Sequence, residues 1–86
     1  MTGIYKIENV INNKVYVGQS KDIEARWYQH IHSLEHGWHD NRHLQNSWNK
    51  YGQSSFSFSV IELCEEDKLT EREQYWIDFY GGINSD

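Results

Sequence analysis

The spacing of hydrophobic positions divides the chain into strand-like and helix-like segments. Residues 3–9 (GIYKIEN) and 14–18 (KVYVG) are short runs rich in β-branched and aromatic residues, which is typical of strands. Asn12 and Asn13 lie between them, and both can take positive φ in a tight turn. These features predict an antiparallel hairpin.

Two helices are predicted after the hairpin. Residues 22–36 carry hydrophobic side chains at helical spacing, with Asp22 as the expected N-cap and Gly37 as the stop. Their stripe is Ile23, Trp27, Ile31 and Leu34. Residues 40–51 repeat the pattern, with Asp40 as the expected cap and Gly52 as the end. Their stripe is Leu44, Trp48 and Tyr51.

Residues 55–63 begin with Ser and Phe in alternation, which predicts a strand with one buried face. A third helix is predicted over residues 67–80, ending before Gly81 and Gly82. The element order β-β-α-α-β-α predicts an α+β fold, in which helices flank a small three-stranded antiparallel sheet. A chain of 86 residues without a repeat, a linker or a proline is expected to be one domain spanning residues 1–86.

Composition indicates the cellular compartment in which the protein is expected. The single cysteine, Cys64, excludes an intrachain disulfide and a cysteine-rich zinc site, and a lone thiol fits a reducing compartment. The first residues lack the apolar run of a signal peptide, and no segment is long and apolar enough to span a bilayer. We therefore expect a soluble, cytoplasmic protein that does not use a membrane.

Charge is unevenly distributed along the chain. The net charge is −5, and residues 51–86 carry eight acidic and two basic side chains, whereas residues 1–50 are near neutral. An acidic domain holds DNA weakly, because phosphate neutralisation supplies most of the affinity. If the domain acts on DNA, we expect another segment to do most of the binding.

Glu73 interrupts the hydrophobic stripe of the third predicted helix. The stripe runs through Leu69, Trp76, Ile77 and Tyr80, and position 73 falls where a hydrophobic residue is expected. Carboxylates are rarely buried unless they are paired or bound to a metal. The pattern leaves three interpretations open: a salt bridge, a stripe that ends at its edge, or a metal ligand.

Four further side chains are candidates for chemistry. Arg26 and His30 share a face of the first helix, where they could bind phosphate and carry a proton, or simply form a solvated helix edge. Tyr5 and Tyr16 lie on the two strands of the hairpin, where tyrosines usually pack. A phenol has an ordinary pKa of about 10, so it becomes a base only beside a cation that stabilises phenolate.

Histidines cluster between positions 30 and 43. The pairs His32/His36 and His39/His43 have the i,i+4 spacing that can hold zinc on a helix face. No third ligand is evident, because Cys64 is distant in sequence. A small zinc-binding protein is therefore one alternative.

Two short motifs lie on the strands of the predicted hairpin: Gly3-Ile4-Tyr5 and Tyr16-Val17-Gly18. Arg26 and His30 follow the hairpin, and Glu73 comes before Trp76 and Ile77. In this order along the chain, these residues resemble the GIY-YIG endonuclease family, with Val in place of the middle Ile of the second motif. The resemblance covers the whole chain and is greatest to phage and group I intron homing endonucleases.

The resemblance implies metal-dependent hydrolysis of phosphodiester bonds in double-stranded DNA. It implies that Glu73, rather than Glu71, holds one Mg²⁺ or Mn²⁺ ion and that Gly18 keeps the strand end clear of a side chain. Arg26 would stabilise charge on phosphorus. The general base stays open among the two tyrosines and His30. The implied catalytic residues are Tyr5, Tyr16, Arg26, His30, His39 and Glu73.

Two features depart from the family pattern. Asn84 does not clearly match the asparagine that the family carries after its last helix, and no separate DNA-binding region is present. We therefore expect a catalytic domain that acts in the host cell of a phage or mobile element, as a monomer or a transient dimer on DNA, beside a C-terminal DNA-binding region. The rivals are a repair nuclease of the same fold that recognises branched DNA, and a non-catalytic interaction module.

Overall fold

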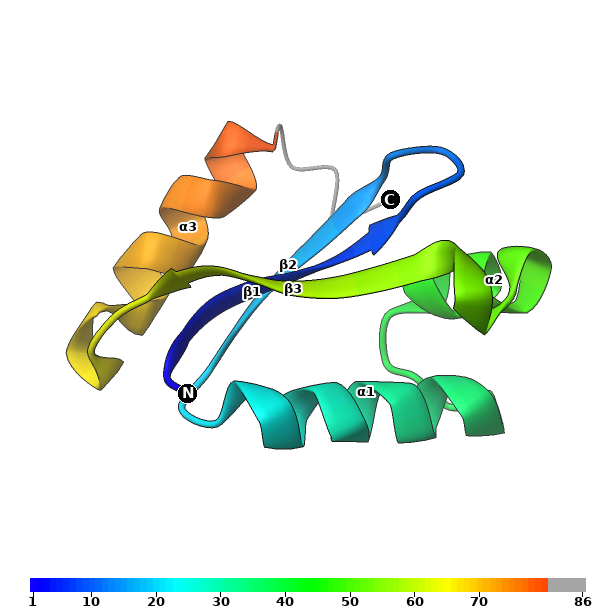
Figure 1. Ribbon diagram of the computed structural model, residues 1–86, viewed down its shortest axis with the longest axis horizontal. Helices are drawn as coiled ribbons and strands as arrows, with labels where there is room; N and C mark the ends of the chain where they lie inside the picture. Colours follow the sequence, from blue (N-terminus) through cyan, green and yellow to red (C-terminus); the bar gives the residue numbers. More distant parts are fainter. Residues whose placement is uncertain (81–86) are drawn as a thin grey trace.

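The computed structural model of the chain describes residues 1–80. Its strands are β1 (Gly3–Asn9), β2 (Val15–Ser20) and β3 (Phe56–Leu63). Its α-helices are α1 (Ile23–His36), α2 (Arg42–Tyr51) and α3 (Leu69–Phe79), and short 3₁₀ turns span Gln53–Ser55 and Glu66–Lys68. The predicted element order and the α+β class are confirmed (Figure 1).

The sheet has the order β2-β1-β3, and β1 pairs antiparallel with both neighbours. The predicted hairpin is confirmed, because Asn13 takes a φ of 63° and its backbone N–H donates to the Asn9 carbonyl at 2.7 Å. In the register of the sheet, Tyr5 lies opposite Gly18 on one side and Val60 on the other. Tyr5 is thus at the centre of the sheet, one strand away from the β2 edge.

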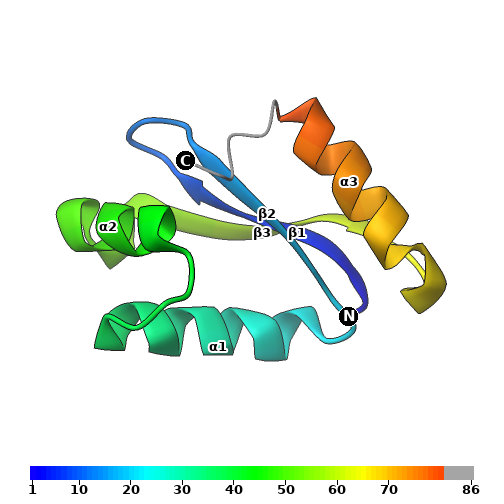
Figure 2. The same cartoon turned by 180° about the vertical axis from the view of Figure 1, so that it is seen from behind.

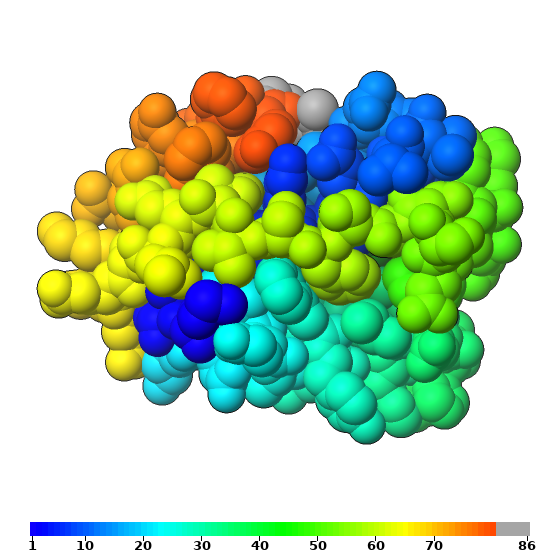
Figure 3. Space-filling model, in the orientation of Figure 1, coloured from blue at the N-terminus to red at the C-terminus, as the bar shows by residue number. Residues whose placement is uncertain are grey.

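Helices cover both faces of this sheet. Ile4 and Val17 pack with Leu69 of α3 on one face, and Ile7 packs with Leu34 of α1 and Trp48 of α2 on the other. Figures 1 and 2 show α1 and α3 on opposite sides of the strands. Figure 3 shows β3 as a yellow-green band between them.

The prediction of one buried face for β3 was wrong. Phe56 and Phe58 pack toward α1 and α2, whereas Ile61 packs toward α3. Side chains on both faces of the strand are therefore partly buried from Phe58 to Glu62. The cause is tertiary, because α3 covers the face that alternation with serine marks as solvent-exposed.

Most predicted helix ends are confirmed. The Asp22 side chain accepts a hydrogen bond from the Ala25 N–H at 3.2 Å, and Gly37 ends α1 in the left-handed conformation. Asp40 does not cap α2. Asn41 does, by accepting from the Leu44 N–H at 3.0 Å, so α2 begins at Arg42.

Within residues 1–80 no helix has the length and apolar character to cross a membrane.

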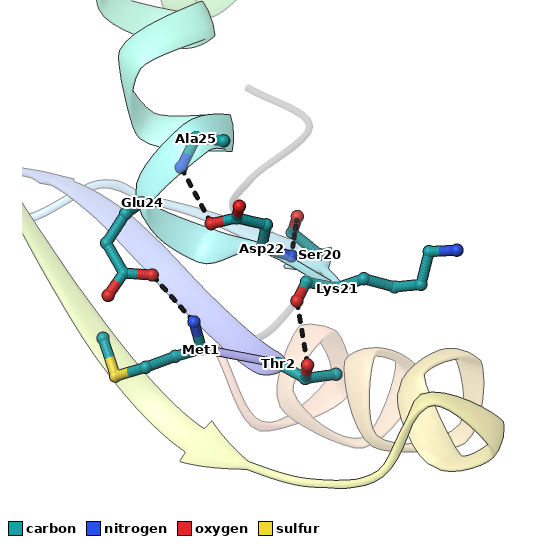
Figure 4. A network of polar contacts seen from close by, with 7 residues as sticks. All are labelled: Met1, Thr2, Ser20, Lys21, Asp22, Glu24 and Ala25. Atoms are coloured by element: carbon teal, nitrogen blue, oxygen red, sulfur yellow. Dashed lines mark hydrogen bonds and ion pairs between the residues drawn. The ribbon is translucent and has the colours of Figure 1, made fainter.

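The start of α1 is tied to the N-terminus of the chain (Figure 4). The N-terminal ammonium of Met1 donates to Glu24 at 2.8 Å, and the Thr2 hydroxyl donates to the Lys21 carbonyl at 2.8 Å. These bonds and the Asp22 cap set the direction in which α1 leaves the sheet. The helix therefore carries position 30 across the face that holds Tyr5.

Candidate active site

The Tyr5 ring lies over Gly18, its neighbour on β2. The side chain of Tyr5 is 1% exposed. A Cβ atom at position 18 would come within 2.4 Å of both the Cζ and the Oη of Tyr5, so only glycine leaves room for the phenol. The expectation that Gly18 keeps this strand end clear is confirmed, and the structure identifies the group that occupies the space.

A chain of hydrogen bonds leads away from the Tyr5 hydroxyl. The Tyr5 Oη lies 2.6 Å from His30 Nε2, and His30 Nδ1 lies 2.7 Å from His39 Nε2. The backbone N–H of Asn41 then donates to His39 Nδ1 at 3.0 Å. His30 is 2% exposed. The hydrogen-bond chain therefore begins inside the protein and ends at the loop before α2.

The hydrogen bond from the Asn41 N–H determines which ring nitrogens of His39 and His30 carry a proton. A backbone amide can only donate, so His39 Nδ1 carries a lone pair and its Nε2 carries the proton. His39 then donates to His30 Nδ1, and His30 donates from Nε2 to the Tyr5 oxygen. The Tyr5 oxygen is therefore an acceptor toward His30, and its own proton is directed elsewhere.

Burial keeps the histidines of this chain neutral. It lowers the pKa of His30 to about 3, with the charges of Arg26 and His39 acting in the same direction. Burial likewise lowers the pKa of His39, although Asp40 opposes the shift. Neutral rings are what the one-directional hydrogen-bond chain requires.

Burial favours the protonated form of the two phenols. Burial raises the pKa of Tyr5 well above its ordinary value and also raises the pKa of Tyr16. The charge of Arg26 lowers both pKa values, and the charge of Glu73 raises both. The ionisation of each phenol therefore responds to charge placed next to Arg26 and Glu73.

Arg26 and Tyr16 line an open pocket beside the histidines. Its volume is about 310 Å³, and Asp40 and Asn41 form part of its wall. Arg26 is solvent-exposed and donates to the Gln29 side chain at 3.1 Å. The Tyr16 ring stands edge-on to His30 at 5.5 Å between centroids. The pocket therefore exposes the Arg26 cation and the Tyr16 phenol next to the buried hydrogen-bond chain.

Glu73 lies on the half-buried side of α3, and Glu71 is exposed. The Gln19 amide donates to Glu73 Oε1 at 3.2 Å, and among residues 1–80 Glu73 has no ion pair. Arg72 instead pairs with Glu62 at 2.9 Å. The salt-bridge interpretation of Glu73 is thus excluded within the described residues, and its charge is left without a neutralising cation there.

The structure gathers most of the predicted site residues, but it brings together only one of the two predicted zinc pairs. The rings of His32 and His36 lie 4.3 Å apart on α1. Tyr5, Tyr16, His30 and His39 meet through the contacts above. The pair His39/His43 does not form on a helix, because residue 39 precedes α2. Within residues 1–80 no three His, Cys, Asp or Glu side chains gather into a metal-binding group. Asn84 lies outside the described residues.

Sequence reasoning missed Gln45. This side chain is 5% exposed; its Oε1 accepts from the His39 N–H and its Nε2 donates to the Leu34 carbonyl, both at 3.0 Å. Gln45 therefore ties the His39 loop to the end of α1. The available signal was its position between Leu44 and Trp48 of a predicted stripe, where an amide is as unusual as a carboxylate.

The family model described as the GIY-YIG catalytic domain matches residues 1–84. The chain therefore belongs to the GIY-YIG catalytic domain family, as its motifs predicted. It is 49% identical over 78 residues to Intron-associated endonuclease 1 of Enterobacteria phage T4. It is 35% identical over 89 residues to Probable intron-encoded endonuclease 1 of Neurospora crassa.

These two matches cover 88% and 95% of the chain, but the chain spans only 31% and 28% of the two relatives. The fold is close to that of the solved catalytic domain of the homing endonuclease I-TevI, with a TM-score of 0.87 at 44% identity. That match covers 94% of this chain and 89% of the solved one. A mutant of the same domain gives a TM-score of 0.84 at 45% identity over 93% and 84% of the two chains.

Proposed function

We propose that this domain hydrolyses phosphodiester bonds of double-stranded DNA, using one Mg²⁺ or Mn²⁺ ion bound by Glu73. The observation that carries the proposal is the directed hydrogen-bond chain from Asn41 to Tyr5. The chain ends at a phenol whose pKa is lowered by the charge of the exposed Arg26 side chain. Such an arrangement prepares a buried phenol to lose its proton next to a group that binds phosphate. A module that only binds a partner has no use for it.

Glu73 suits a hard divalent cation. Its carboxylate is half-buried, hydrogen-bonded to a neutral amide and not neutralised by a cation within residues 1–80. Since no further His, Cys, Asp or Glu of that range joins it in a group of three, phosphate and water would complete the coordination. When bound, the ion supplies positive charge that polarises the phosphate and offsets the charge of Glu73.

Tyr5 is the general base in this proposal. Burial raises the pKa of Tyr5, and the charge of Arg26 and the hydrogen bond from the His30 Nε2–H oppose this shift, because each stabilises negative charge on the phenol oxygen. His30 itself is a poor base, since burial lowers its pKa to about 3 and its Nε2 already carries the proton. Tyr16 packs edge-on against the His30 ring and His39 hydrogen-bonds to it, so both residues hold His30 in place.

The reaction is a displacement at phosphorus by water. Tyr5 first loses its phenol proton to solvent. The phenolate then takes a proton from the attacking water, the new P–O bond forms, and the bond to the 3′ oxygen breaks. Arg26 stabilises the charge that builds on the non-bridging oxygens. The products carry a 5′-phosphate and a 3′-hydroxyl, and the leaving oxygen takes a proton from solvent.

Supercoiled plasmid tests this function. We expect the domain to nick plasmid with Mg²⁺ or Mn²⁺ at low salt, and to be inactive in EDTA. Glu73→Ala should abolish nicking, whereas Glu71→Ala, which removes an exposed carboxylate of the same helix, should cut like the parent. Equal cutting by both variants would contradict the role of Glu73 as the metal ligand. Inactivity of the folded parent would contradict the proposed nuclease function.

The relatives are about three times as long as this chain, and they are named as endonucleases. We propose that a segment outside this domain supplies most of the DNA affinity in the whole protein. The net charge of −5 supports this division of labour. The domain itself would act as a monomer, cutting one strand at each engagement, with a transient dimer on DNA for a double-strand break.

A further inference from the structure

A second hollow shares Tyr16 with the pocket that holds Arg26 and His30. It has a volume of about 280 Å³ and runs between the β1–β2 hairpin and α2, so we name it the hairpin–α2 groove. Tyr16 lines both this groove and the pocket that holds Arg26 and His30. Figures 1 and 2 both place the hairpin turn and α2 at the same end of the molecule, away from α3. The groove therefore continues the active-site surface in one direction.

The charge of the groove is opposite to that of the whole protein. Among residues 1–80 its lining includes Lys14, Lys50 and His43, and no Asp or Glu. The entire α2 helix, with the sequence RHLQNSWNKY, is free of acidic residues. Since the chain has 13 acidic and 8 basic side chains, a basic groove is a local exception in a protein of net negative charge.

Neutral hydrogen-bond donors accompany the cations. Asn46 and Ser47 lie one α-helical turn before Lys50, so they face the groove together with it. Asn9 lines the groove as well; it is 2% exposed, and its Oδ1 accepts from the Ile11 N–H at 2.9 Å. Its Nδ2 is buried without a hydrogen-bond partner among the described residues. Cations interleaved with neutral donors are what phosphate and sugar oxygens require.

We propose that the hairpin–α2 groove binds the DNA strand that flanks the scissile phosphate, with Lys50 contacting a backbone phosphate. This inference rests on the proposed function, because it extends the path of the substrate beyond the pocket. Continuity through Tyr16 gives the direction, and Lys50 on a helix without acidic residues gives the chemistry. The groove is thus the place where an acidic domain holds DNA close enough to cut it.

Binding of a short labelled duplex, followed by fluorescence anisotropy in EDTA so that no strand is cut, tests the groove. We expect Lys50→Ala to weaken binding about threefold to tenfold at about 50 mM salt, and to reduce the slope of log K against log salt by about one. Lys68→Ala is the matched control, because Lys68 is an exposed lysine just before α3 and its loss changes the net charge equally. It should bind within about twofold of the parent.

Lys50→Arg should restore binding, which separates lost charge from a damaged helix. Equal weakening by Lys50→Ala and Lys68→Ala, or none by either, would overturn the proposal. So would an oligoglutamate peptide that binds as tightly as the duplex and loses as much affinity in Lys50→Ala, since the groove would then serve acidic protein partners. Plasmid nicking is measured separately. A parent that binds DNA through Lys50 but never nicks it would refute the proposed nuclease function, whereas DNA binding by the groove would still be supported.

Discussion

Substitution of Gly18 by alanine probes the geometry at the centre of the site. A Cβ there would lie 2.4 Å from Tyr5 Cζ and Oη and 2.7 Å from Cε1, whereas ordinary contacts begin at 3.4 Å. The Tyr5 ring must therefore move by about 1 Å, although it is buried and holds His30 through a 2.6 Å hydrogen bond. A displacement of about 1 Å of a catalytic group costs on the order of 10²-fold in rate.

The same clash has a cost in stability. Overpacking of this kind lowers the free energy of unfolding by about 1–3 kcal/mol. We expect Gly18→Ala to slow single-turnover plasmid nicking by about two orders of magnitude and to lower the urea midpoint. Gly37→Ala is the control, because a Cβ there meets no atom within 4 Å and the strain comes from its φ of 80°, so stability should fall without loss of rate.

A double-mutant cycle isolates the cause. In a Tyr5→Ala background the ring is gone, so the stability cost of Gly18→Ala should nearly vanish. The reasoning fails if Gly18→Ala cuts plasmid at the parent rate. It also fails if its stability cost is unchanged when Tyr5 is absent.

Two further predictions concern the histidine chain. Gln45→Ala should slow nicking and destabilise the domain by about 1–3 kcal/mol in urea titrations, because the His39 N–H and the Leu34 carbonyl lose their partner; an unchanged rate would show that the His39 loop holds itself. Because the pKa of His30 falls to about 3 on folding, the folded state favours the neutral ring, and the unfolded state binds more protons below pH 6.5. Stability should therefore be full above pH 6.5 and decline by up to about 1.4 kcal/mol per pH unit as the pH drops toward 3. A His30→Gln variant should lose this component, and an identical pH profile for variant and parent would contradict the assignment.

Local sequence patterns account for the elements and their order along the chain. The hairpin about Asn13, the Asp22 cap and the Gly37 stop follow from local backbone preferences that need no partner elsewhere in the chain. The break in the α3 stripe at Glu73 singled out that carboxylate for the same reason, because helical periodicity is a local property. The ordered motifs identified the family before any fold was known, and the comparison confirmed it.

The contacts among the candidate site residues depend on tertiary packing, which local patterns do not encode. The sequence could not distinguish Asn41 from Asp40 as the α2 cap, and that choice places an amide against His39. It could not show that α3 covers the second face of β3, nor that Gln45 holds the loop. Hydrogen-bond direction along Asn41, His39, His30 and Tyr5 depends on contacts between residues up to 25 positions apart. Such contacts form only when the sheet register and the exit of α1 are fixed together, because local propensity carries no information about distant partners.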